Sequence, residues 1–329
     1  MGRSGQLELF PSAERATSED DTPGLAEARS LAAGLPEHVR LGTSSWTFPG
    51  WAGIVYPAKT RERELMQRGL ELYTRYPLFR TVGIDRAYYR PLTPLELQQY
   101  RAQLPADFRC VVKVWNEITN AVHPQTREPN PHFLDAELFK SEVLGPLEEH
   151  FADRLGPLLF ELMPLRPNEL PDALEFAERI SGFFGKLPKG PAYAVELRNR
   201  ELFSAAYLDA LRAHQAAHVL NFWERMPTLG EQLAVPGVLT APFAVARLLI
   251  PPGRRYSERR AELEPFDRIV QPELGMRDDV VRLSEACAAL GKVLFVVVNN
   301  KAEGSSPLTV RALAERLASP KLKPAEPRG

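Results

Sequence analysis

Charged and amide side chains interrupt or directly follow short apolar runs in this sequence, and their types can do chemistry. They are Asp85, Lys113, Glu196, Arg198, Asn221, Arg247, Asn299 and Asn300. Glu196 and Arg198 are two residues apart, so in a strand their side chains leave the same face. A partly buried ion pair of this kind is costly unless it is hydrogen-bonded or used on a ligand. The pair therefore predicts either a ligand site or a structural salt bridge at the end of a strand.

Two further cations lie inside apolar runs. Lys113 lies in Cys110–Val114, and Arg247 lies in Phe243–Leu249. A lysine among apolar side chains is desolvated, which suits it to general-base or Schiff-base chemistry; it could equally hold an anion or pair with Glu196. An arginine in such a run is suited to a bidentate hold on a carboxylate or phosphate.

These residue types define a candidate site. The candidate catalytic residues are Glu196, Lys113 and Asp85, and the candidate ligand-binding residues are Arg198, Arg247, Trp46, Tyr89, Asn221, Asn299 and Asn300. The aromatic members would form a stacking platform for a base or a sugar, or else cap the core. The set suits a hydrolase or a lyase, although no particular reaction follows from it.

Other chemistries have weaker signals. Glu161 and Glu196 would suit glycoside hydrolysis only at a separation of ~5 Å or ~6.5–9.5 Å, which the sequence does not supply. The six histidines form neither an HxH nor an HExxH set, so we predict no metal site. Ser44 and Ser45 lack a GxSxG context, so serine hydrolysis is not indicated. No motif indicates a cofactor.

The elements that must position these residues are short apolar runs that alternate with helical patterns. The predicted strands are Val39–Ser44, Thr81–Asp85, Arg109–Val114, Pro157–Leu162, Ala192–Leu197, His218–Phe222, Phe243–Leu249 and Val293–Asn299. The predicted helices are Arg61–Tyr73, Pro94–Gln103, Pro167–Phe183, Ser204–His214, Asp278–Leu290 and Pro307–Leu317. Continuous apolar runs are typical of parallel strands covered on both faces. Eight strands alternating with helices predict an α/β fold, a single-domain (β/α)8 TIM-like barrel.

An open doubly wound sheet is the alternative fold. It normally has a Gly-rich phosphate turn after its first strand, and Gly42–Ser45 does not match GxGxxG. In a barrel, the candidate residues would lie at the carboxyl ends of the strands, where barrel enzymes build their sites. We therefore expect Lys113, Glu196, Arg198 and Arg247 to surround a common cavity.

The composition is that of an ordinary soluble protein, with 44% hydrophobic and 25% charged residues and a formal net charge of −1. With so small a net charge, the protein as a whole is not attracted electrostatically to nucleic acid or to an anionic membrane. Cys110 and Cys287 form no CxxC pair, which favours the reducing cytoplasm. We recognise no secretory signal, and no apolar run approaches the ~20 residues of a membrane span.

The chain is predicted to contain one barrel domain over residues 39–319. Residues 1–38 are expected to be a mostly disordered leader with a short helix near Leu25–Ala33, and residues 320–329 a disordered tail. Two long connections, 116–132 and 251–276, leave the carboxyl ends of predicted strands. They would act as lids or hold ligand, or else be disordered insertions. The second contains a basic cluster of Arg254, Arg255, Arg259 and Arg260.

A short segment of the leader, residues 6–10, resembles the pentapeptide with which bacterial DNA-repair and replication proteins dock on the sliding clamp. The partner-binding residues would be Gln6, Leu7, Leu9 and Phe10. A flexible leader can place two leucines and a phenylalanine in a groove of a partner. The alternative is that these apolar residues fold back onto the barrel.

The barrel region resembles the YecE-like family, known as domain of unknown function 72 (DUF72). The segments that carry the resemblance are Leu41–Trp46 with Trp51 and Tyr56-Pro57, Thr81–Arg90, Val112-Lys113 with Ile118-Thr119, Gly156–Phe160, Val195–Arg198, and Val296–Asn300 with Gly304. The resemblance implies a TIM-like barrel with a polar cavity, and it brings no settled activity.

Five positions depart from the pattern of that family. Gly83 replaces a glutamate, Asp85 an asparagine, Asn120 a histidine, Ser45 a glycine and Lys301 a histidine. These changes indicate a divergent member in which the ligand is altered or turnover is lost.

Three hypotheses follow from the sequence. The first is an enzyme-like barrel that binds a small polar or anionic ligand, held by Lys113, Arg198 and Arg247, with Glu196 and Asp85 handling protons. The second is a factor in DNA metabolism that is tethered to the clamp and contacts DNA through its basic loop and aromatic rim. The third is a ligand sensor without turnover.

Overall fold

Eight parallel strands form the centre of the fold. The structure is a computed structural model that describes residues 24–318. The strands are β1 (Val39–Thr43), β2 (Thr81–Ile84), β3 (Cys110–Lys113), β4 (Leu155–Glu161), β5 (Tyr193–Glu196), β6 (Ala217–Phe222), β7 (Phe243–Leu248) and β8 (Val293–Val298). Each strand pairs with the next, and β8 pairs with β1, which closes the barrel. The (β/α)8 prediction is confirmed, and the open-sheet alternative is wrong.

Side chains inside the barrel follow from the two-residue period of a strand. An apolar layer fills the interior; it comprises Val111, Leu159, Ala194, Ala217, Val219, Ala241, Val245, Phe295 and Val297. The residues between them face outward; Val296 and Val298, for example, belong to the larger core under the helices. Both faces of the strands are therefore buried, which explains the continuous apolar runs of the sequence.

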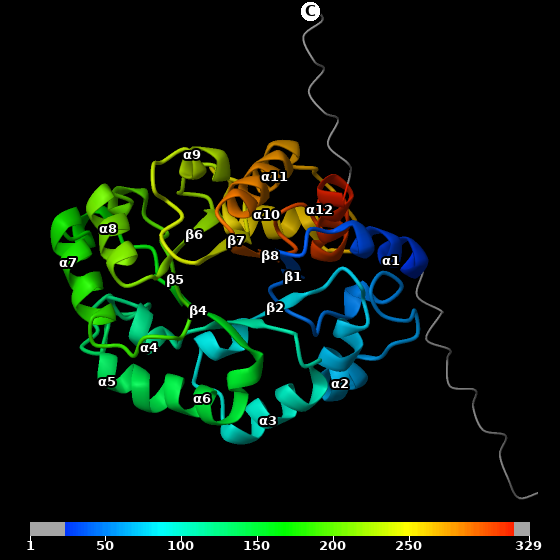
Figure 1. The fold of residues 1–329 in the computed structure, drawn as a ribbon, viewed down its shortest axis with the longest axis horizontal. Helices are drawn as coiled ribbons and strands as arrows, with labels where there is room; N and C mark the ends of the chain where they lie inside the picture. The colour runs from blue at the N-terminus through cyan, green and yellow to red at the C-terminus, as the bar shows by residue number, and fades with distance from the viewer. Residues whose placement is uncertain (1–23, 319–329) are drawn as a thin grey trace, which may run out of the picture.

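Helices surround the strands (Figure 1). The longer ones are α2 (Glu62–Thr74), α3 (Pro94–Gln103), α7 (Ala173–Phe184), α8 (Ala205–Ala213), α11 (Leu274–Ala289) and α12 (Ser306–Ala318). Helix α3 has the predicted bounds, because Thr93 and Glu96 form a capping box at its start. Helix α7 begins later than predicted, at Ala173, because the Asp172 carboxylate caps it. The preceding Pro167–Glu169 forms a separate 3₁₀ turn, η6.

Shorter helices lie in segments where the sequence predicted none. They are α4 (Asn116–Thr119), α5 (Ala136–Phe139), a π-helical turn η4 (Lys140–Leu144), α6 (Gly145–Phe151), α9 (Leu229–Leu233) and α10 (Tyr256–Leu263). Between β3 and β4, the buried side chains Phe139, Val143, Leu147 and Phe151 recur every four residues. The π-helical turn and Gly145-Pro146 obscure this helical pattern in the sequence.

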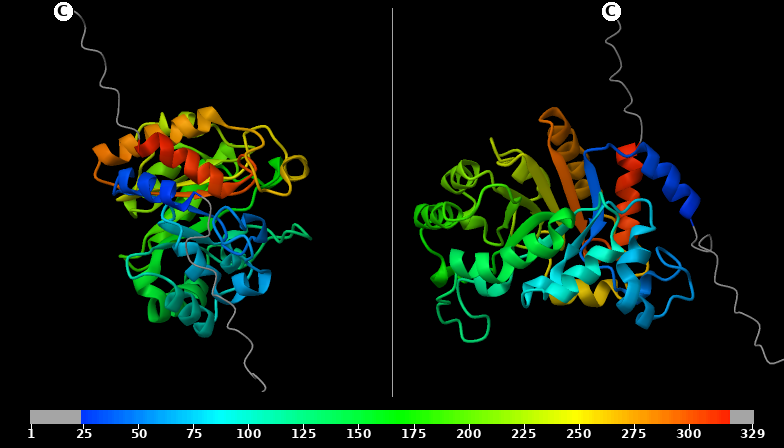
Figure 2. Two further views of the ribbon diagram at one scale, coloured as in Figure 1. Left: turned by 90° about the vertical axis from the view of Figure 1, so that its right-hand side faces the viewer. Right: turned by 60° about the horizontal axis from the view of Figure 1, so that its bottom comes forward.

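Helix α1 (Leu25–Gly34) lies beside α12, and the right-hand view of Figure 2 shows the two next to each other. Ala28 is buried in the contact, and the Arg80 guanidinium donates to the Ala32 carbonyl oxygen at 2.8 Å. The leader thus contains the expected short helix. The clamp-like residues 6–10 and the tail lie outside the described residues.

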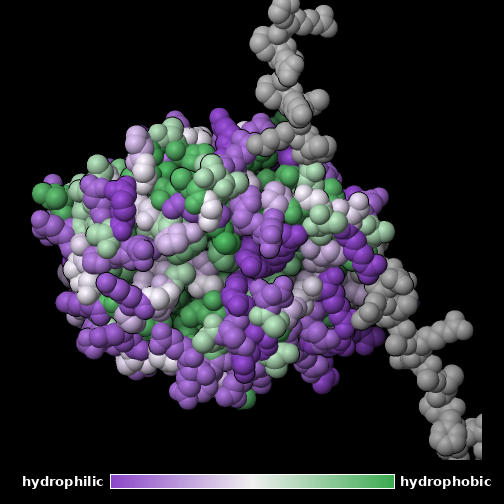
Figure 3. Space-filling view, in the orientation of Figure 1, coloured by the Kyte–Doolittle hydropathy of each residue, from purple (hydrophilic) through white to green (hydrophobic). Residues whose placement is uncertain are grey.

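None of the helices in residues 24–318 is long and apolar enough to span a bilayer. The face shown in Figure 3 carries hydrophilic and hydrophobic residues interspersed.

Candidate functional site

Six ionised side chains converge at the carboxyl ends of the strands. They are Asp85 after β2, Lys113 at the end of β3, Glu161 at the end of β4, Glu196 at the end of β5, Arg198 just beyond it, and Arg247 in β7. Most of them follow a residue of the interior apolar layer by two positions, as Lys113 follows Val111 and Arg247 follows Val245. The strand period therefore places their side chains on the barrel axis, directly above that layer.

Glu161 is the hub of this charge cluster. Its Oε2 atom lies 2.8 Å from Lys113 Nζ, 2.8 Å from Arg198 Nη2 and 2.7 Å from Arg247 Nη1. The Glu161 side chain is only 7% exposed. Three cations on one carboxylate offset the cost of removing that carboxylate from water.

The other two carboxylates complete the cluster. Glu196 is fully buried and accepts from Arg198 Nε at 3.0 Å and from Arg247 Nη1 at 2.5 Å. Asp85 Oδ2 lies 3.3 Å from both Lys113 Nζ and Arg247 Nη2. The Asp85 side chain is 31% exposed, which makes it the most accessible of the three carboxylates.

The cluster is electrically balanced, with three carboxylates and three cations. Burial by itself raises the pKa of Glu161, but Arg198, Lys113 and Arg247 outweigh it and hold the pKa well below its usual range. Burial lowers the pKa of Arg247, but Glu196, Asp85 and Glu161 outweigh it and raise the pKa above its ordinary value. Glu161 and Arg247 thus remain charged and serve as fixed charges, not as proton donors or acceptors.

A cavity of about 260 Å³ lies over the cluster. Its lining comprises Asp85, Tyr89, Lys113, Glu161, Arg198, Trp223, Arg247, Leu249, Ile250, Asn299 and Lys301. The Arg198 guanidinium lies 4.1 Å from the centre of the Trp223 ring. Trp223 is 9% exposed, and its Nε1 has no hydrogen-bond partner within residues 24–318. A buried donor without a partner is unusual in a folded protein.

Most of the predicted residues meet at this cavity. Lys113, Arg198, Arg247 and Asp85 line it together with Tyr89 and Asn299. Glu196 lies beneath the floor, since Arg198 and Arg247 cover it. Asn300 lines a neighbouring cavity.

Two predicted ligand-binding residues lie elsewhere and correct the expectation. Trp46 lines neither cavity; its ring packs edge-on against Tyr100 at 5.3 Å between centroids. Asn221 is fully buried, and its Nδ2 donates to the Leu197 carbonyl oxygen at 2.6 Å. The Trp46 ring is thus used in packing, and the Asn221 amide bonds the backbone that follows β5.

Three residues of the site were not assigned to it from the sequence. The sequence indicates Glu161 only as half of a glycosidase pair, and Trp223 is a further residue of the cavity wall. Tyr88 lies under Lys113, with the ammonium 5.1 Å from the ring centre. Burial, followed by the nearby Glu161 charge, raises the pKa of Tyr88 to about 12, so its phenol stays protonated. The signal for Glu161 was present, because it follows the interior residue Leu159 by two positions.

The paired-carboxylate mechanism for glycosides does not fit this geometry. Glu161 and Glu196 both contact the same Arg247 nitrogen, so a guanidinium occupies the space between their carboxylates. Among the described residues, no three His, Cys, Asp or Glu side chains are grouped to hold a metal ion.

The positions that depart from the family pattern lie around this region. Gly83 is in β2, where a Cβ atom would meet Ser44 Cα at 3.2 Å and Val297 Cγ1 at 3.3 Å. A larger side chain there would crowd the barrel interior beside Asp85. Asn120 is buried and accepts from the Tyr88 hydroxyl at 3.1 Å. Lys301 lines both cavities, and Ser45 lines the neighbouring one.

Both long connections are folded against the barrel. In 116–132, the Arg127 Nε donates to Glu169 at 2.9 Å. In 251–276, the basic cluster is neutralised in part: Arg254 pairs with Glu262, and Arg260 pairs with Glu264 at 2.8 Å. The third member, Arg259, is fully buried. The disordered-insertion alternative is therefore wrong for both connections.

The fold and the site together define the class of protein. It is a closed (β/α)8 barrel with a buried, charge-balanced cluster under a cavity at the carboxyl ends of its strands. Residues 40–329 match the model of the family described as "Protein of unknown function DUF72". The chain belongs to that family, as the sequence resemblance predicted.

Solved structures of the same family share the fold. A DUF72 family protein from Thermotoga maritima is 20% identical, with a TM-score of 0.56 over 85% of this chain and 99% of that one. One from Enterococcus faecalis is 16% identical, with a TM-score of 0.55 over 88% of this chain and 99% of that one. Among curated proteins, no significant match was found.

Proposed function

We propose that the cavity over the charge cluster binds a small polar ligand and that the barrel acts on it as an enzyme. The observation that carries this proposal is that five charged side chains of the cluster line one cavity together with the buried Trp223; they are Asp85, Lys113, Glu161, Arg198 and Arg247. Buried polar groups of this kind are expensive in a folded protein and are concentrated where ligands bind. Their location at the carboxyl ends of barrel strands supports the same interpretation.

The charge balance bears on the kind of ligand. Lys113, Arg198 and Arg247 already contact the three carboxylates, so an anionic ligand would have to displace Asp85 or Glu161 from a cation. An uncharged ligand with hydroxyl groups can instead accept from the cations and donate to the carboxylates without breaking these ion pairs. A neutral polyhydroxyl compound is therefore favoured over an anion.

The accessible carboxylate is the best candidate for proton handling. Asp85 lines the cavity, whereas Glu196 touches it only through Arg198 and Arg247. We assign Asp85 the role of proton acceptor, and we assign Glu196 the role of orienting the two guanidinium groups. Lys113 lies between Asp85 and Glu161 and acts as a fixed cation at the cavity wall.

Tryptophan fluorescence tests the proposal directly, because Trp223 lines the cavity. The protein would be titrated with glycerol, D-ribose and inorganic phosphate. We expect a polyol to change the emission and phosphate to act more weakly. The change should disappear in Trp223→Phe and should weaken in Asp85→Asn. Lys189→Ala, in a separate cavity near the start of β5, is the matched control and should leave the titration unchanged.

The outcome also separates an enzyme from a sensor. Chemical consumption of the bound polyol, lost in Asp85→Asn, supports the enzyme. Binding without consumption supports a sensor at the same cavity. Unchanged titrations in both the Asp85 and Trp223 variants would remove the cavity from consideration.

A second candidate function rests on the segment Gln6-Leu7-Glu8-Leu9-Phe10, which lies outside the described residues. We propose that this segment docks on the bacterial sliding clamp and tethers the barrel to DNA metabolism. A fluorescent peptide of residues 1–15 titrated with the clamp is the test. Binding that is lost when Leu9 and Phe10 are both replaced by alanine supports the proposal, and the absence of saturable binding counts against it.

A further inference from the structure

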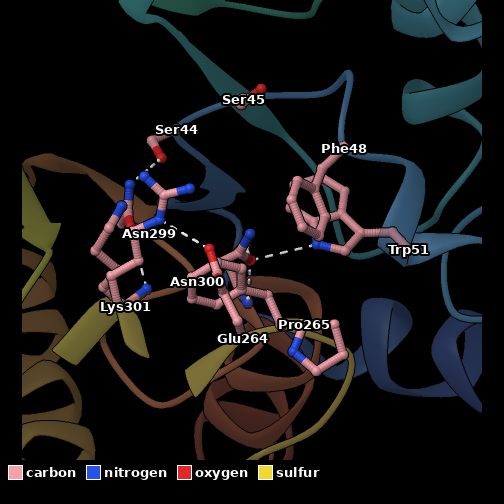
Figure 4. Close-up of a pocket in the computed structure, with 12 residues that line it drawn as sticks. Ser44, Ser45, Phe48, Trp51, Glu264, Pro265, Asn299, Asn300 and Lys301 are labelled. Carbon is pink, nitrogen blue, oxygen red and sulfur yellow. Dashed lines mark hydrogen bonds and ion pairs between the residues drawn. The ribbon is translucent and has the colours of Figure 1, made fainter. Parts of the chain in front are cut away.

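A second, larger cavity lies directly beside the first. It has a volume of about 470 Å³ and is lined by Ser44, Ser45, Phe48, Trp51, Arg260, Glu264, Pro265, Phe266, Asn299, Asn300, Lys301 and Ser306. Figure 4 shows Phe48 and Trp51 on one side of it and Asn299, Asn300 and Lys301 on another. Asn299 and Lys301 also line the first cavity, so the two cavities share a wall.

Aromatic rings form one side of this second cavity. The half-buried Phe48 ring lies 5.7 Å from the Trp51 ring and 5.8 Å from the Phe266 ring, measured between centroids. Trp51 and Phe266 are buried and hold Phe48 in place. A partly exposed, well-supported ring is a surface on which a planar group can stack.

The polar side of the cavity presents oriented hydrogen-bond donors. Asn300 Oδ1 accepts from Trp51 Nε1 at 3.3 Å and from the nitrogen and hydroxyl of Ser306 at 2.9 Å and 2.7 Å. These bonds fix the amide, so its NH₂ group is left to donate into the cavity. Asn299 Nδ2 donates to Ser44 Oγ at 3.0 Å, which leaves the Ser44 hydroxyl proton available as a second donor. The arrangement suits a group rich in hydrogen-bond acceptors.

We propose that the second cavity is a subsite for a planar ring that carries hydrogen-bond acceptors, and that one ligand spans both cavities. The polyhydroxyl part would occupy the first cavity, and the ring would stack on Phe48 and accept from Asn300. A nucleoside has this combination of a polyhydroxyl ring and a planar, carbonyl-bearing ring. The inference rests on the proposed function for the first cavity, but the ring subsite can be tested by itself.

Three related probes separate the two cavities. D-ribose probes the first cavity, uracil probes the second, and uridine joins the two parts. Binding would be followed by isothermal titration calorimetry on the full chain. We expect uridine to bind about tenfold more tightly than D-ribose, which lies within the range that one base–aromatic stack contributes.

Two variants test the contacts of the ring. Phe48→Leu keeps an apolar side chain against Trp51 and Phe266 but removes the stacking surface. Asn300→Asp keeps an oxygen for Trp51 and Ser306 but replaces the donor with a negative acceptor. Each should abolish uracil binding and bring uridine down to the affinity of D-ribose. Phe243→Leu, at the opposite end of the barrel, is the matched control for the loss of a half-buried ring.

The outcomes distinguish the two claims. Uridine that binds no more tightly than D-ribose, or that is unaffected by both variants, overturns the ring subsite and leaves the first cavity intact. If uracil binds in a way that depends on Phe48 and D-ribose does not bind, the ring subsite is supported. The same result contradicts the proposed polyhydroxyl site in the first cavity. Thermal unfolding of each variant verifies that the loss of binding is not a loss of folding.

Discussion

At the scale of single residues, Arg247 joins the three carboxylates of the charge cluster. Its guanidinium contacts Asp85, Glu161 and Glu196, and its side chain is only 2% exposed. Removing it would leave three buried or half-buried carboxylates with two cations. Such an unpaired buried charge is far more costly than the loss of an ion pair in water.

We predict that Arg247→Met lowers the free energy of unfolding by about 3–5 kcal/mol, measured by urea denaturation. Arg101→Met is the matched control, because Arg101 pairs with Asp153 on the surface with its side chain 54% exposed. Its loss should cost no more than about 1 kcal/mol. Equal effects in the two variants would mean that the charge cluster contributes no more than a surface pair.

The residue types of the site could be predicted from the sequence, but their partners could not. Lys113 and Arg247 were visible because each interrupts an apolar run. Lys113 contacts Glu161 from the neighbouring strand, but the contact between Arg247 and Glu161 joins β7 to β4 across the closed barrel. Trp46 illustrates the converse: its position at a strand end suggested the site, while its ring packs against Tyr100. Contacts across the barrel exist only because the sheet closes into a ring, and no local sequence pattern specifies which side chains then meet.

At the scale of elements, helix α9 is joined to β6 by the buried side chain of Gln232. With five residues it is too short to be stable alone. Gln232 attaches it to β6: its Nε2 donates to the Asn221 carbonyl oxygen at 2.8 Å, and its Oε1 contacts His218 Nε2 at 3.3 Å. His218 is buried, and burial lowers its pKa to about 4. The neutral ring is therefore the form that fits between β6 and α9.

This contact predicts a loss of stability in acid. The pKa of His218 is about 4 in the folded state and 6.5 in an ordinary environment, so between these values the unfolded state binds the proton more readily. Stability is then fully present above about pH 6.5 and falls toward pH 4, by at most about 3 kcal/mol. Urea denaturation across this range should show a flatter profile for His218→Gln than for the natural chain. His214→Gln is the control, and the same flattening there would contradict the assignment.

A second element-scale prediction concerns the segment 251–276, which supplies Pro265 and Phe266 to the wall of the second cavity. Arg259 is fully buried and fixes this segment to the β8–α12 connection. Its guanidinium donates to the carbonyl oxygens of Lys301 at 3.2 Å and Ala302 at 2.8 Å. It thereby holds two walls of the cavity together.

We expect Arg259→Met to increase hydrogen exchange and proteolysis within 251–276 while the strands remain protected. Arg260→Met, on the same helix with its side chain 62% exposed, should leave exchange unchanged. Exchange that rises over the whole barrel would show instead that Arg259 stabilises the global fold. No change in either variant would contradict the role of Arg259.

The elements themselves were largely predictable. All eight strands lie within two residues of their predicted bounds, because a continuous apolar run ends where polar residues begin. The segment from Ala136 to Phe151 was not predicted, since a π-helical turn shifts its helical period. Helix α10 was also not predicted, because its many charges hide its buried positions, which include Arg259 and Leu263.

At the scale of the whole molecule, charge bears on the clamp-tethered hypothesis. The net charge is −1. In the basic cluster of 251–276, Arg254 pairs with Glu262, Arg260 pairs with Glu264 and Arg259 is buried, which leaves the exposed Arg255. Proteins that bind DNA by themselves gain most of their affinity from cations that contact phosphates. The barrel offers few such cations in this segment, so a tether through the leader would have to provide the localisation.

We therefore predict that the chain alone binds duplex DNA weakly, with a dissociation constant no lower than ~10⁻⁴ M at physiological salt, and with a shallow salt dependence. Fluorescence anisotropy with a labelled duplex at several salt concentrations provides the measurement. Replacing Arg254 and Arg255 by glutamate should change the affinity little, because Arg254 is already paired with Glu262. If this double variant instead lowers DNA affinity and flattens the salt slope, the connection itself contacts phosphates, and the barrel needs no clamp to reach DNA.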